Sequence, residues 1–401
     1  MNKKVLRLAI PNIISNLSVP LLGAVDTALV GHLEEVFYLG ALAVGSMIFN
    51  FIFWGFGFLR MGTTGLTAQS FGEENKTESV MILARAMGVA ALFGFIIIAL
   101  QYVLADLSFL LIDASPEVER YTRIYFHIRI YTAPATLGLY AINGWFLGMQ
   151  NARYPMYVTV FLNLLNVALD FWFIYGAGMH VDGVAIGTLI ARYAGFALAV
   201  TLLLVKYRDW LSEYVHQKLL ELEPIKKFFT VNRDIFIRTL CLIFTFSFFT
   251  AKSATFGDVI LAANTILLQM WMIVSYGIDG FAFAAESLIG KYTGSRKQKK
   301  INEAVKYCFY WGIGIGLAAS LTYAIFEMPI LRIFTDQQPV IEAAVLVFGW
   351  TIAGPAVSSF CYIWDGIFIG ATATVPMGSF YDYSYRFSFL ADLFFISTLF
   401  R

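Results

Sequence analysis

Two aspartates stand in stretches of this sequence that are otherwise long and apolar. Asp170 lies in "NVALDFWFIYG", with Asn166 one helical turn before it, and Asp26 lies in "VDTALVGHL". Carboxylates inside apolar membrane segments are costly, and they mark ion or proton pathways by default. The alternative for each is a hydrogen bond to backbone at a kink or a helix end. The composition of the whole chain favours the first interpretation.

The composition is that of an integral membrane protein. Of 401 residues, 59% are hydrophobic and only 14% are charged, whereas a soluble domain is about 25% charged. The net charge of +1 gives no indication of a nucleic-acid partner. The three cysteines lie in apolar stretches without paired spacing, so neither a disulfide framework nor a zinc site is expected. We expect the lipid bilayer as the surroundings of most of the chain.

The apolar segments are long enough for ten membrane spans, since a helix needs about 20 residues to cross. The expected spans are 6–32, 39–71, 80–111, 118–149, 154–178, 183–205, 234–251, 258–290, 303–326 and 340–370. An eleventh candidate, 380–400, is poor. The apolar run near the N-terminus is long enough to be the first span itself, so no cleavable signal peptide is expected.

The longest polar stretch divides the chain into two halves. Residues 206–233 are amphipathic and basic, and we expect them to form a cytoplasmic linker. Residues 1–205 then form an N-terminal lobe of spans 1 to 6. Residues 234–401 form a C-terminal lobe of spans 7 to 11 with an atypical or truncated end.

Lysine and arginine set the expected orientation. With a cytoplasmic N-terminus, three basic residues fall in outer loops, namely Arg120, Lys252 and Arg332. Sixteen fall in inner segments: Lys3, Lys4, Arg7, Lys76, Arg153, Lys206, Arg208, Lys218, Lys226, Lys227, Arg233, Lys291, Arg296, Lys297, Lys299 and Lys300. This asymmetry predicts a cytoplasmic N-terminus.

An internal repeat relates the two halves. Adding 222 to the residue number aligns "LGALAVGSMIFNFIFWGFGF" from Leu39 with "LAANTILLQMWMIVSYGIDG" from Leu261, and it also aligns "NGWFLG" with "DGIFIG". Each half would hold six spans, so the repeat is parallel, which is a transporter architecture. The repeat is not chemically symmetric, because Phe248 takes the position equivalent to Asp26. We expect an all-α membrane fold of two pseudo-symmetric six-helix lobes, incomplete at its C-terminal end in this chain.

Four oxygen-bearing side chains reach similar depth in the first lobe. At ~1.5 Å per residue, Asp26, Asp170 and Thr188 lie about 9, 12 and 8 Å from the outer ends of their spans. Asn166 shares a helix face with Asp170. Two adjacent carboxylates repel each other, so one retains a proton and the pair titrates as a unit. Hard oxygen ligands also suit sodium; we favour a proton, and both coupling ions stay open.

A second set of charges suggests an inner gate. Arg60 in the second span and Asp279 in the eighth lie equally far along repeat-related helices, and Glu286 lies two turns beyond Asp279. Pairing makes charges tolerable within a membrane. Arg60 would pair with Asp279 or Glu286 across the lobes when the protein faces outward. Alternatively, each charge is satisfied within its own lobe.

The order of motifs resembles the multidrug and toxic compound extrusion (MATE) transporters, in particular their DinF-like branch. The matching stretches are "VDTALVGHL", "GFLRMGTTGLTAQSFGEEN", "NVALDFWFIYG", "GVAIGT" and "GIDGFAFAAESLIGKYTG". The resemblance covers roughly residues 5 to 375. After Met377 the sequence departs from the family pattern, which has a full eleventh and a twelfth span.

The resemblance implies a two-lobed antiporter that exports amphipathic, often cationic compounds against a proton or sodium gradient. It implies a cation site at Asp26, Asn166, Asp170 and Thr188. It also implies that Asn143, and less directly Asn163, line a substrate cavity. We therefore expect a monomeric, multi-pass protein of a bacterial plasma membrane, with small amphipathic substrates and no cofactor beyond the coupling ion.

Two other functions compete with the antiporter. A flippase for lipid-linked precursors, of the same superfamily, should have a strongly cationic central cavity, and the first lobe offers acids instead. An intramembrane enzyme could use Asp26 and Asp170 as an acid pair, but the repeat and the lack of a "GxGD" or "HExxH" motif argue against one. We expect no enzyme activity.

Overall fold

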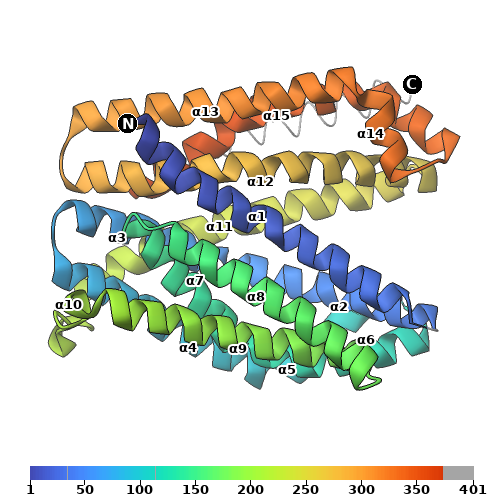
Figure 1. Cartoon of the computed structure of the whole chain (residues 1–401), viewed down its shortest axis with the longest axis horizontal. Helices are drawn as coiled ribbons and strands as arrows, with labels where there is room; N and C mark the ends of the chain where they lie inside the picture. Colours follow the sequence, from blue (N-terminus) through green and yellow to red (C-terminus); the bar gives the residue numbers. More distant parts are fainter. Residues whose placement is uncertain (34, 113, 374–401) are drawn as a thin grey trace.

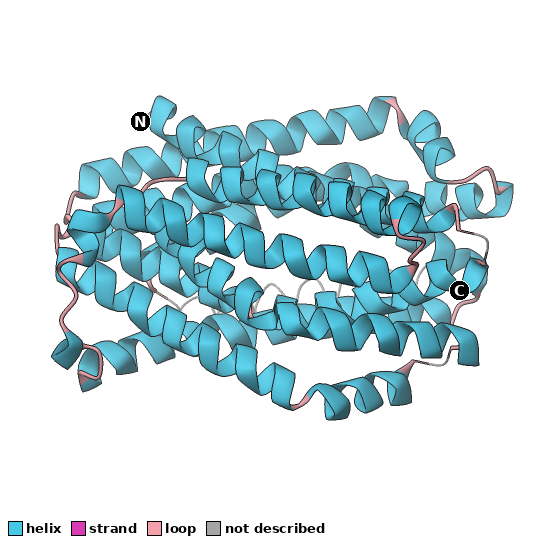
Figure 2. Cartoon of the chain, turned by 60° about the horizontal axis from the view of Figure 1, so that its bottom comes forward, coloured by secondary structure: helices cyan, strands magenta, loops and turns pink. Residues whose placement is uncertain are grey.

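The computed structural model describes residues 1–33, 35–112 and 114–373, and within these ranges every regular element is a helix (Figure 2). The first group of helices is α1 (Asn2–Gly31), α2 (Val36–Gly55), α3 (Gly57–Gly72), α4 (Lys76–Ala99), α5 (Gln101–Leu111), α6 (Pro116–Arg129), η1 (Ile130–Thr132), α7 (Ala133–Gly148), α8 (Arg153–Phe171), η2 (Trp172–Gly176) and α9 (Val181–Lys206). The second group is α10 (Arg208–Leu211), η3 (His216–Lys218), α11 (Leu222–Ala254), α12 (Asp258–Gly294), α13 (Gln298–Ile325), α14 (Glu327–Phe334) and α15 (Gln338–Ala371).

The ten expected spans all correspond to helices. Nine helical segments in the described ranges are long and apolar enough to cross a membrane. The tenth is α6–η1–α7, in which the 3-10 turn at Ile130–Thr132 separates two shorter helices. The expected eleventh span, 380–400, lies outside the described residues.

The helices form two lobes, as the repeat predicts. In Figure 1 the helices from α2 to α9 form the lower lobe, α11 to α15 form the upper lobe, and α1 runs diagonally along both. Helix α1 packs on α8 in the first lobe and on α12 in the second. Within the expected linker 206–233, residues 206–221 hold the short elements α10 and η3, and residues 222–233 form the first turns of α11.

The lobes meet closely at one end, where the turns between α3 and α4, α7 and α8, and α12 and α13 lie. Lysines and arginines at the start of α4 and α8 and around the α12–α13 turn outnumber the two glutamates of the α3–α4 turn, so we call this the basic end. Small residues let the backbones touch there. A methyl group added at Gly72 of α3 would overlap the carbonyl oxygen of Lys291, and one added at Gly294 of α12 would overlap that of Gln69. Contacts this close leave no space between α3 and α12 at the basic end.

Hydrogen bonds reinforce this seam between the lobes. Gln69 Nε2 donates to the Gly370 carbonyl at 3.1 Å, and Gln150 Nε2 donates to Ser287 Oγ at 2.7 Å. Ser287 Oγ in turn donates to the Leu147 carbonyl at 2.6 Å. The described structure is therefore closed between the lobes at its basic end.

Alanine at Gly72 or Gly294 should weaken this seam. The added methyl group has a rigid carbonyl as its neighbour, so the helices must move apart, at a cost on the order of 1–3 kcal/mol. We expect each variant to melt several degrees lower than wild type in detergent. The matched control is Gly88→Ala in α4, where an added methyl group has no atom within 4 Å. Equal melting temperatures for all three variants would contradict the close contact.

Candidate functional site

Asp170 is fully buried near the end of α8, where the helix widens into the π-helical turn η2. Asn166, 2% exposed, lies one turn earlier, and its Nδ2 donates to Asp170 Oδ2 at 2.9 Å. The second carboxylate oxygen, Oδ1, has no donor among the described residues. A buried oxygen without a donor is costly, so Oδ1 needs a proton or a donor from outside α8.

Asp26 brings a second carboxyl group to the same place from α1. The two side chains lie within hydrogen-bonding range of each other. Oδ1 of Asp26 is also buried without a protein donor. Two carboxyl groups can share a hydrogen bond only if one carries a proton, and like charges so close together are not readily ionised at once. The pair is thus suited to hold a proton.

The space for Asp170 comes from a glycine that sequence reasoning did not single out. A methyl group added at Gly187 of α9 would overlap Asp170 Oδ1. Thr188, the next residue, is buried but makes no hydrogen bond among the described residues. Gly187 lies in the quoted motif "GVAIGT", which is the signal that could have identified it.

Two arginines also lie near the carboxyl pair. Arg129 of α6 and Arg192 of α9 both interact electrostatically with Asp26. Arg129 donates to the Tyr125 hydroxyl group and to Ser46 Oγ, the latter at 3.4 Å. Neither arginine was among the site residues predicted from the sequence.

These arginines bear on which ion the site fits. A sodium ion needs several oxygen ligands and gains from surrounding negative charge. Here two oxygens are without a donor, and two guanidinium groups oppose a further cation. The positive charge of the two arginines thus disfavours a sodium ion beside the pair, and this observation enters the proposal below.

The two asparagines expected in the substrate cavity are differently placed. Asn143 of α7 is half-buried, and its Oδ1 has no hydrogen-bond partner in the described structure. Asn163 of α8 instead donates to the Ser18 hydroxyl group at 2.9 Å and the Ser18 carbonyl at 3.2 Å. Asn163 therefore ties α8 to α1, two residues before Pro20.

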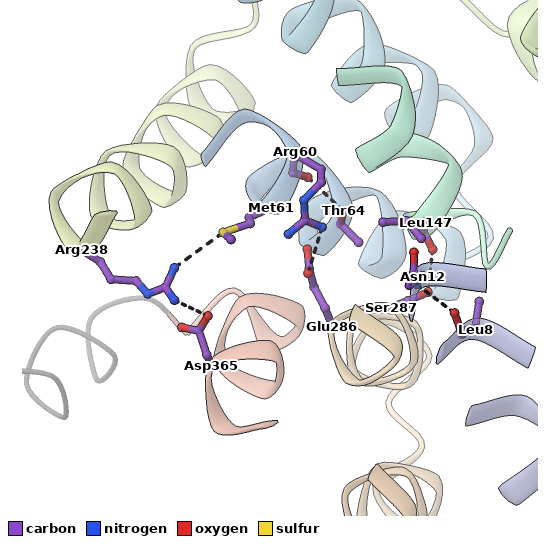
Figure 3. A network of polar contacts seen from close by, with 10 residues as sticks. All are labelled: Leu8, Asn12, Arg60, Met61, Thr64, Leu147, Arg238, Glu286, Ser287 and Asp365. Atoms are coloured by element: carbon purple, nitrogen blue, oxygen red, sulfur yellow. Dashed lines mark hydrogen bonds and ion pairs between the residues drawn. The ribbon is translucent and has the colours of Figure 1, made fainter. Parts of the chain in front are cut away.

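The charges expected to form an inner gate lie on two helices, Arg60 on α3 and both Asp279 and Glu286 on α12, and Figure 3 shows Arg60 directed at Glu286. Arg60 Nη1 lies 3.5 Å from Glu286 Oε2, so one ion pair joins α3 of the first lobe to α12 of the second. The guanidinium group also lies 4.0 Å from the centroid of the Phe283 ring. Asp279 interacts electrostatically with Arg60, but Glu286 is the residue that contacts it.

A second pair lies beside this one. Arg238 of α11 contacts Asp365 of α15 at 2.5 Å and the Met61 sulfur at 3.7 Å. Figure 3 shows the Arg238 and Arg60 side chains on either side of Met61, each directed at an acid of the second lobe. Asp365 was not among the site residues predicted from the sequence, although it begins the repeat motif "DGIFIG".

Alanine at Gly187 should displace the Asp170 carboxyl group. The change can be followed by infrared difference spectroscopy between acid and neutral pH, using the band of the protonated carboxyl group that Asp170→Asn removes. We expect this band to shift or weaken in Gly187→Ala, because the methyl group occupies the position of Oδ1. The control is Gly195→Ala on the same helix, which meets only the Leu162 side chain. A band unaltered by Gly187→Ala would refute the packing described.

A charge exchange should identify the partner of Arg60. Arg60→Asp leaves Glu286 buried without its cation, and breaking a buried ion pair costs about 3–5 kcal/mol. We expect a lower melting temperature, which Glu286→Arg added to Arg60→Asp should partly restore. Asp279→Arg in the same background should restore less, because Asp279 makes no contact with Arg60. Equal recovery from both second changes would argue against the specific pair.

Comparison with known proteins agrees with these motifs. The family model MatE matches residues 11–172 and 235–378. "DNA damage-inducible protein F" of Escherichia coli (strain K12) is 35% identical over 379 residues, which is 94% of this chain and 82% of that protein. "Probable multidrug resistance protein NorM" of Thermotoga maritima is 23% identical over 361 residues, covering 86% of this chain and 75% of that protein.

Solved structures show the same fold. An outward-facing multidrug resistance MATE family transporter of the MOP superfamily superimposes with a TM-score of 0.81 at 20% identity, over 93% of this chain and 84% of that one. A MOP superfamily transporter from Pyrococcus furiosus superimposes with a TM-score of 0.83 at 21% identity, over 94% of this chain and 84% of that one. Because the family model and the Escherichia coli relative each match most of its length, this chain belongs to the MatE family, the multidrug and toxic compound extrusion transporters.

Proposed function

We propose that this protein exports amphipathic organic compounds, organic cations among them, in exchange for protons by alternating access. Its family supplies the general activity, which is transport across a membrane. The observation that carries the finer proposal is the carboxyl pair of Asp26 and Asp170. These two groups come from different helices, are largely buried, and each has an oxygen without a protein donor.

The position of the pair supports coupling through α1. Asp26 lies five residues before the end of α1, far from the basic end. The same helix is bound to the second lobe through Asn16, whose Nδ2 donates to the Tyr276 carbonyl at 3.3 Å, and through Lys4, whose Nζ donates to Tyr292 at 3.2 Å. A change in the contact between Asp26 and Asp170 therefore acts on a helix that spans both lobes. Moving α1 would alter how the lobes meet.

The closed basic end supports an outward-facing arrangement. The distribution of lysine and arginine predicts that this end faces the cytoplasm. The seam between α3 and α12 and the pair of Arg60 with Glu286 then close the inner side. In the inward-facing state these contacts would have to separate, since a transporter opens to one side at a time.

The alternatives receive less support from the described residues. A flippase for lipid-linked precursors needs a strongly cationic central cavity. Between the lobes Arg60 and Arg238 each contact a carboxylate, and in the first lobe Arg129 and Arg192 lie near the carboxyl pair. An acid-pair enzyme needs a reactive site for substrate and water beside its carboxyl groups. The family relationship and the closed packing around Asp170 favour transport instead.

Replacing Asp170 with asparagine should abolish export while the protein still folds. Asparagine keeps the shape of the side chain but removes the group that is protonated and released in each cycle. The measurement is efflux of a cationic dye from proteoliposomes with an imposed proton gradient, at equal protein content.

The matched control is Asp106→Asn, which neutralises an exposed aspartate paired with Arg123 on the surface. It should retain dye efflux. Efflux at the wild-type rate in Asp170→Asn would overturn the assignment, and efflux driven equally well by a sodium gradient would overturn the choice of ion.

A further inference from the structure

Arg192 lies in the middle of a membrane span, α9. Its charged side chain has no hydrogen-bond partner and no ion pair among the described residues. It is half-buried and lies 11 residues from the start of α9 and 14 from its end. The nearer end is therefore about 17 Å away along the helix. That is farther than an arginine side chain can extend, so Arg192 does not reach the membrane surface as residues near helix ends do.

The surroundings of Arg192 lie inside the first lobe. It interacts electrostatically with Arg129, Tyr125 and Tyr140, as well as with Asp26. Phe196, one turn further along the same face of α9, packs on Gly138 of α7. These neighbours come from α1, α6 and α7, so Arg192 faces the interior of the first lobe from α9.

Further polar groups on α7 also lack partners. Thr136, Tyr140 and Asn143 follow one another at helical spacing on one face of α7. Thr136 is only 3% exposed, and its hydroxyl oxygen has no hydrogen-bond partner in the described structure. The same holds for Asn143 Oδ1, and the Tyr140 hydroxyl group makes no hydrogen bond to a described residue. Two of these three groups can donate, as can every nitrogen of Arg192.

The charges around Arg192 do not balance. Arg129 and Arg192 carry two positive charges, and the pair of Asp26 with Asp170 carries one negative charge when it shares a proton. One positive charge is left over inside the lobe. Such a charge is unfavourable in a membrane unless something pairs with it, and a guanidinium group binds planar oxyanions through two parallel hydrogen bonds.

We infer that the first lobe contains a site for the negatively charged group of an amphipathic organic anion, a carboxylate or a sulfonate, with Arg192 as its main contact. Arg129 adds a second positive charge, and the Tyr140 hydroxyl group of α7 adds a further donor. The single excess charge matches a monoanion better than the diphosphate of a lipid-linked precursor. The inference rests on the proposed export function in one respect, because it takes the bound anion to be a compound that the protein transports.

The test compares ligands that share one apolar body and differ in charge: 1-pyrenebutyrate, 1-pyrenebutanol and 1-pyrenebutylamine. Binding to the purified full-length chain in detergent is followed by quenching of tryptophan fluorescence. We expect wild type to bind the carboxylate about tenfold or more tightly than the alcohol, as for a charge-assisted contact. Arg192→Gln should remove this preference and leave affinity for the alcohol unchanged, whereas Arg192→Lys should retain part of it.

The matched control is Arg120→Gln, which removes one positive charge from an exposed position on α6 of the same lobe. It should leave the preference for the carboxylate intact. The inference is overturned if wild type binds the carboxylate no more tightly than the alcohol, or if Arg192→Gln weakens both ligands equally.

If Arg192→Gln does not fold, the wild-type series and Arg192→Lys still decide the question. Competition by inorganic diphosphate that matches competition by acetate, or exceeds it, would point to a phosphate ligand and overturn the choice of carboxylate or sulfonate. The measurement needs no proton gradient, so its result is separate from that of the dye-efflux experiment on Asp170→Asn.

Discussion

Burial of the Asp170 carboxyl group is the constraint on which the first lobe depends. Within a membrane a helix forms the hydrogen bonds of its own backbone, but its backbone has no donor left for a buried carboxylate. Asn166 supplies one donor from the same helix, which fixes the orientation of the group. Gly187 leaves room for the other oxygen without offering it a donor. The unsatisfied oxygen of Asp170 instead lies near Asp26, which belongs to a different helix. Burial of one carboxyl group therefore brings α1 and α8 into contact.

Helix α1 connects this requirement to the opposite end of the molecule. Its 30 residues make it about 45 Å long, and it packs on both lobes. The contacts at the basic end differ in kind from those around Asp170. At Gly72 and Gly294 backbone meets backbone, so that seam responds to helix position and not to protonation. Under the proposed mechanism, a proton bound at one end of α1 would therefore bias packing at the other end without any charge crossing between them.

The sequence was sufficient for features that depend on apolar length and on charge within apolar segments. It predicted the ten spans, the two lobes and the meeting of Asp170 with Asn166, because helical spacing determines such contacts. The sequence did not predict that α11 begins at Leu222. Polar residues such as Lys226 and Lys227 are typical of a linker, but here they form the first turns of the helix, before its apolar part. Nor did it identify Gly187 or Arg192. A glycine in a glycine-rich helix has no signature of its own, and the direction of a single arginine depends on packing between helices.

The internal repeat explains why the two lobes have different chemistry on similar backbones. The offset of 222 pairs Asn143 with Asp365. In the second lobe Asp365 is held by Arg238, whereas in the first lobe Asn143 Oδ1 is left without a partner. The same comparison pairs Asp26 with Phe248. At these two repeat-related positions, an ion pair holds the second-lobe aspartate, whereas the first-lobe side chains keep an oxygen that a proton or a ligand can satisfy. Binding at Asp26 or Asn143 can therefore change packing in the first lobe, at positions whose second-lobe equivalents are a phenylalanine and an ion-paired aspartate.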